Sequence, residues 1–176
     1  TFTESASNYS IKKLYVLTLN SQSLPSIPLA DVTAECSVAS ITAPTATDNC
    51  EGTITGTTTT VFPITAQGTT VVTWNFDDGN GNISMQTQNV VIDDVTDPVA
   101  PTLADVTGEC SATVPVPTTT DNCAGTVTGT TSDPLTYTTQ GTFTVTWNFD
   151  DGNGNDIDVV QTVIVDDVTD PIITCP

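Results

Sequence analysis

The sequence contains no histidine and only two basic residues, Lys12 and Lys13, against 21 aspartates and glutamates, so its formal net charge is -19. Nucleic acid and anionic lipid headgroups would repel such a chain, and we expect neither as a partner. The lack of histidine and of a Cys-x-x-Cys spacing argues against a zinc site. Composition instead favours a cation that prefers oxygen ligands, and calcium is the first to consider.

Long hydrophobic runs are also missing. No stretch of about 18 apolar residues predicts a transmembrane helix, and the amino terminus lacks the pattern of a signal segment, so we expect no membrane insertion. The chain begins with Thr1 rather than Met, which favours a mature or internal piece of a longer exported protein. Aromatic residues make up only 6% of the chain. The core is therefore expected to be thin and to rely on short runs of Val, Ile and Thr.

Helical spacing is absent as well, whereas alternation with a period of two is frequent. In residues 143–149, Phe143, Val145, Trp147 and Phe149 share one face of a predicted strand, and threonines and Asn148 share the other. The Asp-Asp-Gly-Asn-Gly-Asn stretch that follows is rich in residues that tolerate positive φ and predicts a hairpin. The sequence therefore predicts an all-β protein, with its tryptophans in the core rather than stacked on a sugar.

An internal repeat organises the chain. The motif Leu-Ala-Asp-Val-Thr-x-Glu-Cys at residues 29–36 returns at residues 103–110, and Trp-Asn-Phe-Asp-Asp-Gly-Asn-Gly-Asn at residues 74–82 returns unchanged at residues 147–155. The two copies are offset by 74 residues at the first motif and by 73 at the second. A repeat of this length suits a small β-sandwich domain rather than one turn of a solenoid. We predict two tandem immunoglobulin-like β-sandwich domains, at residues 29–98 and 99–171. Residues 172–176 are predicted to be the start of a third unit.

Residues 1–28 do not belong to the repeat. Their hydrophobic run at residues 14–19 predicts a strand. This strand is either the last strand of a preceding domain or a donor strand that completes a neighbouring subunit.

Three motifs taken together resemble hyalin repeats and related bacterial immunoglobulin-like surface repeats. They are Pro-Thr-Ala-Thr-Asp-Asn-Cys at residues 44–50, the strand that ends in an Asp-Gly-Asn hairpin, and Asp-Pro-Ile-Ile-Thr-Cys-Pro at residues 170–176. The resemblance spans residues 29–176. It implies an immunoglobulin-like fold, an adhesive or spacer role in a large extracellular protein, and no catalytic activity. Residues 99–103 lack the Cys-Pro found at residues 175–176, so the family's disulfide scheme cannot be transferred whole.

The five cysteines divide into two in each repeat and the separate Cys175. An even pair in each domain of an exported chain favours a disulfide within that domain. We therefore expect Cys36 to bond with Cys50 and Cys110 with Cys123, while Cys175 bonds with a residue outside this sequence. The alternative is that the paired cysteines stay as reduced, buried thiols.

The acidic turns are the one group of residues in the sequence that suggests a binding site. Calcium takes about six to eight oxygen ligands at about 2.3 to 2.6 Å, and these turns offer carboxylate, amide and backbone oxygens. In an immunoglobulin-like sandwich the hairpin before the last strand lies at the amino-terminal pole, so the hairpin of the second repeat should face the linker that leaves the first. The ligands expected at this junction are Asp93, Asp94, Asp97, Asp121, Asp150, Asp151, Asn153 and Asn155.

Equivalent acidic residues occur at the outer ends of the repeats. They are Asp77, Asp78, Asp166, Asp167 and Asp170. The segment before the first repeat, residues 21–28, carries no acidic residue, so a calcium site near Asp77 and Asp78 should be poorer in ligands or absent. The alternative to calcium is that all these residues are turn formers and solvated surface charge.

These observations predict a non-enzymatic spacer or stalk repeat of a large secreted or cell-surface adhesin or extracellular filament. Calcium between repeats and disulfides within them would make it rigid, and its partners would be neighbouring repeats, with self-assembly into filaments left open. A glycosidase is not expected, because the acidic pairs lie in turns of both copies, where no enclosing pocket would separate their pKa values. The alternative is an adhesive module that binds carbohydrate or protein directly.

Overall fold

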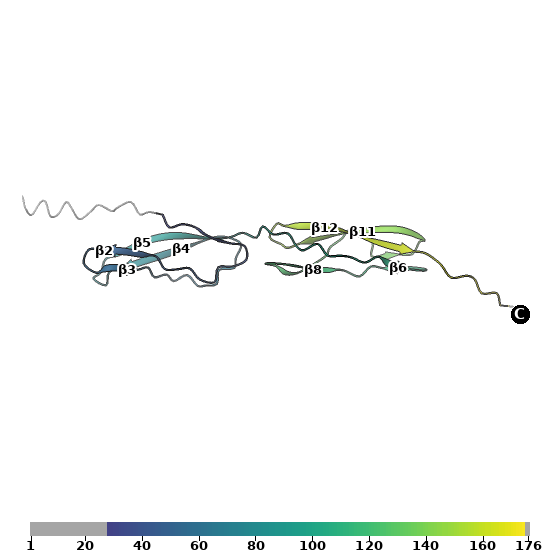
Figure 1. Cartoon of the computed structure of the whole chain (residues 1–176), viewed down its shortest axis with the longest axis horizontal. Helices are drawn as coiled ribbons and strands as arrows, with labels where there is room; N and C mark the ends of the chain where they lie inside the picture. The colour runs from purple at the N-terminus through teal and green to yellow at the C-terminus, as the bar shows by residue number, and fades with distance from the viewer. Residues whose placement is uncertain (1–27, 175–176) are drawn as a thin grey trace, which may run out of the picture.

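The computed structural model describes residues 28–174, and every regular element in that range is a β-strand. The all-β prediction is confirmed. Figure 1 shows two narrow units lying end to end, with the chain passing once from one to the other. Within residues 28–174 there is no helix that could cross a membrane. The predicted strand at residues 14–19 and Cys175 lie outside the described residues.

The first repeat contains a three-stranded sheet and a hairpin. Its strands are β1 (Val32–Ala34), β2 (Thr45–Asp48), β3 (Gly52–Thr55), β4 (Gly68–Asp77) and β5 (Ile83–Ile92). In the sheet, β5 lies between β1 and β4, and it runs parallel to β1 and antiparallel to β4. The hairpin is formed by β2 and β3, and a bridge between Thr57 and Asn75 connects it to β4.

The second repeat has the same arrangement. Its strands are β6 (Val106–Gly108), β7 (Ala112–Thr113), β8 (Thr118–Asp121), β9 (Gly125–Thr128), β10 (Thr136–Tyr137), β11 (Gly141–Asp150) and β12 (Asp156–Val165). Strand β12 lies between β6 and β11, while β8 and β9 form the hairpin. The pair of β7 and β10 corresponds to a single bridge, Val38 to Ile64, in the first repeat. The immunoglobulin-like assignment and the domain limits stay predictions.

Alternation along the long strands produces one separate core in each repeat. Val145, Trp147 and Phe149 of β11 are buried, while Thr146 is exposed and Asn148 is half-buried, as the period of two predicts. Trp147 Nε1 donates a hydrogen bond at 2.9 Å to Gln161, whose amide donates to the Ala104 carbonyl oxygen at 2.8 Å. No residue belongs to both clusters among residues 28–174, so the junction does not depend on a shared hydrophobic core.

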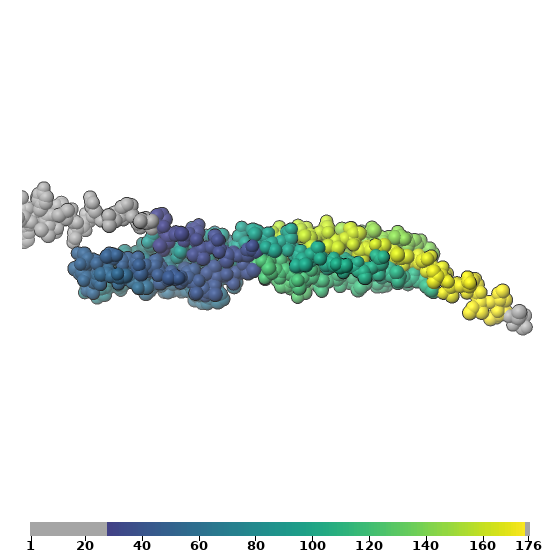
Figure 2. Space-filling model, viewed as in Figure 1, coloured from purple at the N-terminus to yellow at the C-terminus, as the bar shows by residue number. Residues whose placement is uncertain are grey.

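The surfaces of the two repeats meet directly at the junction. Figure 2 shows that the first repeat continues into the second without a gap on the face in view, and that the segment after β12 leaves the rod at its far end. Because the cores are separate, the polar residues at this meeting point decide how the repeats are held together.

Candidate functional site

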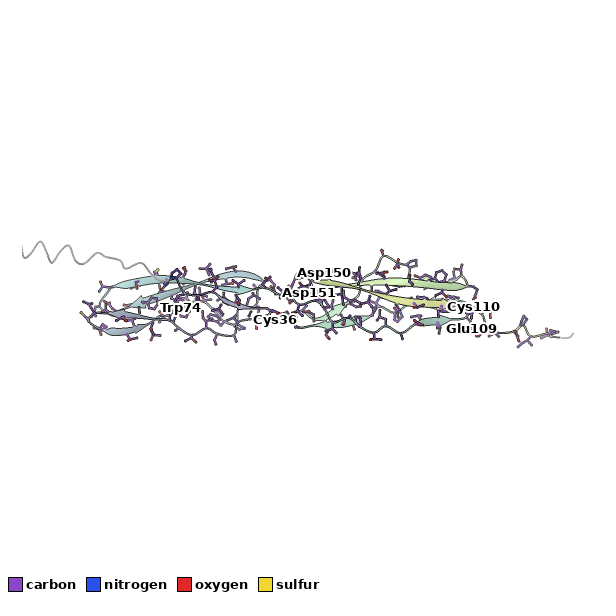
Figure 3. All side chains as sticks on the ribbon, turned by 45° about the horizontal axis from the view of Figure 1, so that its top comes forward. Cys36, Trp74, Glu109, Cys110, Asp150 and Asp151 are labelled. Atoms are coloured by element: carbon purple, nitrogen blue, oxygen red, sulfur yellow. A yellow bond between two sulfur atoms is a disulfide. The ribbon has the colours of Figure 1, made fainter. Side chains whose placement is uncertain are left out.

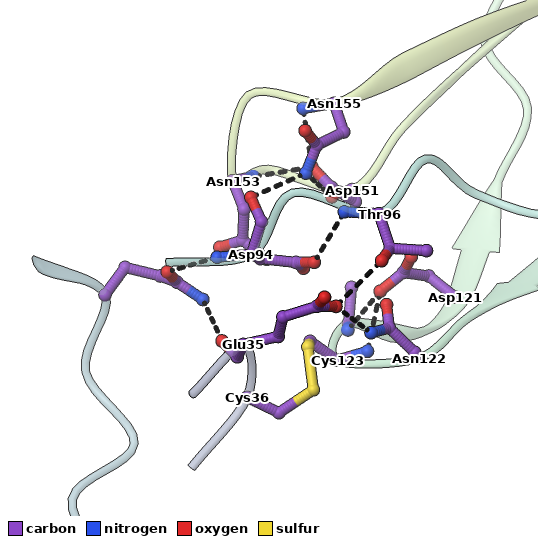
Figure 4. Close-up of a disulfide and its surroundings, with 12 residues drawn as sticks. Glu35, Cys36, Asp94, Thr96, Asp121, Asn122, Cys123, Asp151, Asn153 and Asn155 are labelled. Carbon is purple, nitrogen blue, oxygen red and sulfur yellow. Dashed lines mark hydrogen bonds between the residues drawn. A yellow bond between two sulfur atoms is a disulfide. The ribbon is translucent and has the colours of Figure 1, made fainter. Parts of the chain in front are cut away.

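A disulfide joins the two repeats. Cys36 of the first repeat is bonded to Cys123 of the second, 87 residues later in the sequence, with Cα atoms 4.9 Å apart (Figure 4). Cys50 and Cys110 are exposed free thiols. The predicted pairs Cys36–Cys50 and Cys110–Cys123 are therefore wrong, and so is the alternative that all four cysteines stay reduced and buried.

The pairing within a repeat fails because its two cysteines lie at opposite poles. Cys36 follows β1, whose last residue is level with Ile92 at the carboxyl end of β5. Cys50 lies in the turn between β2 and β3, and the next residue, Glu51, contacts the hairpin at the other end of β4 and β5. Ten-residue strands separate the poles by about 30 Å, whereas bonded cysteines need Cα atoms within about 7 Å.

Three carboxylates gather beside this disulfide. Asp94 lies in the linker, Asp121 ends β8, and Asp151 lies in the hairpin between β11 and β12, and one oxygen of each lies within 4.8 Å of the others. Asp94 and Asp121 are only 4% and 8% exposed. A carboxylate oxygen of Glu35, a carboxylate oxygen of Asp94 and the sulfur of Cys123 also lie within 4.8 Å of one another. That sulfur is bonded in the disulfide, so it is not a free ligand. The junction thus contains four carboxylates, contributed by both repeats and the linker.

Asp94 is held by bonds that cross from one repeat to the other. Its backbone N–H donates to Gln67 Oε1 of the first repeat at 3.0 Å. Asn153 Nδ2 of the second repeat donates to Asp94 Oδ2 at 2.9 Å, and Asn155 Nδ2 donates to the Asp94 carbonyl oxygen at 3.0 Å (Figure 4). The Asp94 carboxylate of the linker is therefore fixed against the hairpin of the next repeat, as the sequence-based topology argument expects.

Asp151 organises that hairpin. Its Oδ1 accepts hydrogen bonds from the backbone N–H groups of Asn153 at 2.7 Å and Asn155 at 3.2 Å, and its Oδ2 accepts from Asn155 Nδ2 at 2.8 Å. Burial raises the pKa of Asp151, but the bonds from Asn155 and the turn backbone outweigh it and the pKa is lowered. Gly152 and Gly154 have φ of 81° and 111°, which other residues rarely adopt, so the tight turn requires them.

Asp121 supplies the observation that points to a ligand. Its Oδ1 accepts from the backbone N–H groups of Cys123 and Ala124, both at 2.7 Å, whereas its Oδ2 is buried without a hydrogen-bond partner. No Lys, Arg or His occurs anywhere in residues 28–174. At this spacing each pair of carboxylates repels by about 3 kcal/mol for an effective dielectric constant of about 20. A bound cation would satisfy the buried oxygen and offset the repulsion.

Other predicted ligands are placed elsewhere. Asp93, Asp97 and Asp150 are exposed and lie outside the cluster, and Asp150 Oδ1 accepts from the Gly152 N–H at 2.8 Å within its own turn. The remaining predicted ligands lie at the two outer ends of the described rod, where no cluster of three acidic residues forms within residues 28–174. They are Asp77, Asp78, Asp166, Asp167 and Asp170.

Sequence reasoning missed Glu35 and Asn122, which connect the repeats directly. Glu35 Oε2 accepts hydrogen bonds at 2.7 Å from both Thr96 Oγ1 and Asn122 Nδ2. Both residues sit next to a cysteine of the repeat motif, Glu35 before Cys36 and Asn122 before Cys123. Assigning those cysteines to one inter-repeat bond would have revealed their neighbours as junction residues.

The chemistry that the junction offers is cation binding through oxygen ligands. Asp94, Asp121 and Asp151 supply at least three oxygens, and amide oxygens, backbone carbonyls and water can complete the six to eight that calcium takes. No protein-family model matches the chain, and no curated protein matches it. Function is therefore argued from the junction itself.

Proposed function

We propose that the two repeats are a spacer or stalk segment of a secreted or cell-surface protein. A calcium ion at the junction, together with the Cys36–Cys123 disulfide, would hold them in a rigid line. The observation that carries the proposal is the cluster of Asp94, Asp121 and Asp151 around a buried oxygen with no partner. The resemblance to hyalin repeats and the disulfide both support an exported location.

Calcium suits the cluster for reasons of distance and charge. Oxygens on opposite sides of a calcium ion lie up to about 5 Å apart, since each is bound at about 2.3 to 2.6 Å. The three carboxylate oxygens lie within 4.8 Å of one another, so a single ion can reach all of them. Magnesium demands shorter, near-octahedral bonds and holds its water more tightly, which makes it the weaker candidate.

Such an ion would act on the linker rather than on either core. Asp94 belongs to the linker, while Asp121 and Asp151 belong to the second repeat, so an ion bound to all three fixes the direction in which the linker enters that repeat. The disulfide lies beside this cluster and connects the second repeat to Cys36, which belongs to a segment of the first repeat outside the linker. Two separate restraints would prevent the repeats from swinging about the linker.

Calcium titration of the full chain by calorimetry tests this proposal. We expect saturable binding with a dissociation constant on the order of 10⁻⁴ M or tighter, and an Asp151→Asn variant that binds at least about tenfold more weakly. Asp150→Asn is the matched control, because it removes the same charge from the neighbouring residue outside the cluster. No heat at millimolar calcium, or an equal loss in both variants, would contradict the proposal.

The alternative function is an adhesive module that binds carbohydrate or protein directly. Trp74 and Trp147 are the natural candidates for stacking on a sugar, but their side chains are only 3% and 1% exposed and belong to the cores. No catalytic role is proposed, because the acidic residues of the junction are engaged in turn and inter-repeat bonds. We therefore retain the spacer role.

A further inference from the structure

The half of the junction that the first repeat contributes is assembled around Cys36. Gln67 Nε2 donates to the Glu35 carbonyl oxygen at 3.3 Å, and Gln67 Oε1 accepts from the Asp94 N–H at 3.0 Å. Glu35 Oε2 also accepts from Thr96 Oγ1 at 2.7 Å. These bonds all lie between the first repeat and its linker. They set the position of the proposed ligand Asp94 relative to the residue beside Cys36, and they need no contact with the second repeat.

The far end of the second repeat shows that such bonds form without a disulfide. Cys110 occupies the position of Cys36 there, and it is bonded to no other cysteine within the described part of the chain. Gln140 Nε2 still donates to the Glu109 carbonyl oxygen at 2.8 Å, and Gln140 Oε1 accepts from the Asp167 N–H at 2.8 Å. Figure 3 shows Glu109 and Cys110 at this end of the second repeat, away from Cys36. A linker carboxylate is thus positioned whether or not the neighbouring cysteine is bonded.

The half that the second repeat contributes is likewise formed on its own. Asp121 Oδ1 accepts from the Cys123 N–H at 2.7 Å, so one turn fixes this ligand and this cysteine together. The equivalent turn of the first repeat has the same bond, from the Cys50 N–H to Asp48 Oδ1 at 2.7 Å, although Cys50 is a free thiol. Asp151 is held by bonds within its own hairpin. Neither half of the proposed calcium site therefore requires the disulfide for its own shape.

The disulfide instead fixes the two halves relative to each other. It holds the Cα atoms of Cys36 and Cys123 4.9 Å apart, and the Asp94 oxygen of the first half then lies within 4.8 Å of the Asp121 and Asp151 oxygens of the second. All three groups are acidic, and the described part of the chain contains no basic residue that could draw the halves together. The bond keeps them close against this repulsion. It therefore lowers the entropic and electrostatic cost of gathering the ligands around an ion.

The disulfide and the proposed ligands lie close enough to affect each other directly. Carboxylate oxygens of Glu35 and Asp94 lie within 4.8 Å of the Cys123 sulfur. Glu35 Oε2 accepts from Asn122 Nδ2 at 2.7 Å, which connects the two segments that carry the bonded cysteines. Asn122 in turn follows Asp121 directly. Loss of the bond between the cysteines therefore releases the segments that carry the ligands.

We infer that the disulfide and the junction ion strengthen each other, so that calcium makes the Cys36–Cys123 bond harder to reduce and reduction of the bond weakens calcium binding. Thermodynamic linkage requires both effects to have the same factor. The inference rests on the proposed calcium site and goes beyond it, because two restraints that act independently would give no such factor. The junction is then a redox-sensitive joint. It is rigid when oxidised and loaded with calcium, and a reducing thiol weakens both restraints together.

Reduction proceeds by exchange with a small thiol such as glutathione, which can reach the bond because Cys36 and Cys123 are both half-buried. One glutathione thiolate attacks a sulfur of the protein disulfide, which forms a mixed disulfide and frees one cysteine thiolate. A second glutathione thiolate attacks the glutathione sulfur of the mixed disulfide, which frees the other cysteine thiolate and forms oxidised glutathione. Two electrons and two protons thus pass from two glutathione thiols to the two cysteines.

The redox equilibrium of the junction bond tests the inference. In the test chain, serine replaces the three other cysteines of the sequence, Cys50, Cys110 and Cys175. This chain is equilibrated in glutathione buffers, with calcium or with chelator at equal ionic strength, and its reduced fraction is measured by mass after alkylation. At half reduction, we compare the squared concentration of reduced glutathione divided by the concentration of oxidised glutathione. We expect this quotient to be at least about tenfold higher in saturating calcium, which is about 30 mV for a two-electron couple. An equal or lower quotient in calcium would overturn the inference.

Two aspartate variants of the test chain separate binding at the junction from general screening of the acidic surface. Asp151→Asn removes a proposed ligand, and we expect it to lose most of the shift that calcium causes. Asp150→Asn removes the same charge from the neighbouring residue outside the cluster, and it should keep the shift. An equal shift in the two variants would show that calcium acts by screening alone and would overturn the inference.

Calorimetry of the test chain measures the reciprocal effect and distinguishes this inference from the proposed function. Calcium is titrated into the oxidised chain and into the chain held reduced with dithiothreitol. We expect the reduced chain to bind calcium at least about tenfold more weakly, by the factor that the redox equilibrium gives. Equal affinities of the two forms would overturn the coupling and leave the calcium site in place. No binding to the oxidised chain would overturn the calcium site and, with it, the coupling.

Discussion

One carboxylate oxygen of Asp121 accepts two hydrogen bonds, whereas the other is buried without a partner. The metal proposal therefore predicts that one substitution of Asp121 changes the melting temperature in opposite directions with and without calcium. Asp121→Asn keeps the Oδ1 acceptor and puts an N–H donor where the unpartnered Oδ2 faces Asp94 and Asp151. In chelator we expect the variant to raise the melting temperature by about 4 to 8 °C, since about 1 kcal/mol of repulsion and desolvation is relieved. In calcium it should lose the stabilisation that the ion gives the unmodified chain. Melts in both conditions decide, and an equal decrease in both would contradict the account.

Asp151 predicts a dependence on pH. Hydrogen bonds from Asn155 and the turn lower its pKa below the ordinary value of 3.8 in spite of burial. A carboxylate whose pKa is lower in the folded than in the unfolded state stabilises the fold above the unfolded value, and this contribution is lost as the pH falls through the folded value. In chelator, thermal melts between about pH 6 and pH 3 should therefore show a loss of stability below about pH 4 that is smaller in Asp151→Asn. An identical pH profile for the variant would argue against this role.

Individual residues divide into those that sequence can place and those that it cannot. The approach of Asp151, Asn153 and Asn155 to the linker follows from where a hairpin lies in a β-sandwich, so it is predictable without coordinates. The partner of Cys36 is not, because counting two cysteines per repeat says nothing about which pole each occupies. Glu35 was missed for the same reason, since its role depends on the neighbouring repeat rather than on its own.

At the level of elements, a glutamine on the central strand of each three-stranded sheet, buried in the second repeat and half-buried in the first, connects the strand on one side to the segment on the other. In the second repeat Gln161 joins Trp147 to the Ala104 carbonyl oxygen, and Gln88 joins Trp74 to Ala30 in the first. Gln161→Leu should lower the free energy of unfolding of the second repeat by about 2 to 3 kcal/mol, because a donor and an acceptor lose their partners on burial. Hydrogen exchange that resolves the two repeats should show the first unaffected. Val160→Ala, on the exposed face beside it, is the control that should leave both unchanged.

Strand patterns in the sequence differ in how much they reveal. The ten-residue strands β4 and β5 of the first repeat, and β11 and β12 of the second, are recognisable from alternating Val, Trp and Phe and from the Asp-Gly-Asn turn between them. The parallel pairing of β1 with β5 is not recognisable, because it joins segments such as Val32 and Val90 that share no turn and no local pattern. Three-residue strands of this kind depend on the sheet that is already present.

For the whole molecule, the repeats are separate cores connected by a polar, covalently bonded junction. Replacing Cys36 and Cys123 with serine should lower the free energy of unfolding of the first repeat by about 2 to 4 kcal/mol, because the bond closes a loop with a sequence separation of 87 that contains most of that repeat and restrains its unfolded state. The same change should increase the angular freedom between the repeats. Urea unfolding of each repeat, followed by tryptophan fluorescence, measures the first effect, and an unchanged stability of the first repeat would contradict it.

The most direct measurement of the central claim is nuclear spin relaxation of the full chain, which reports how each repeat tumbles. In calcium with the disulfide intact, both repeats should fit one elongated diffusion tensor, because the ion restrains the linker and the disulfide restrains a second segment of the first repeat. With chelator and reductant, the repeats should require two separate tensors. Two tensors under both conditions, with no change on adding calcium, would contradict the account.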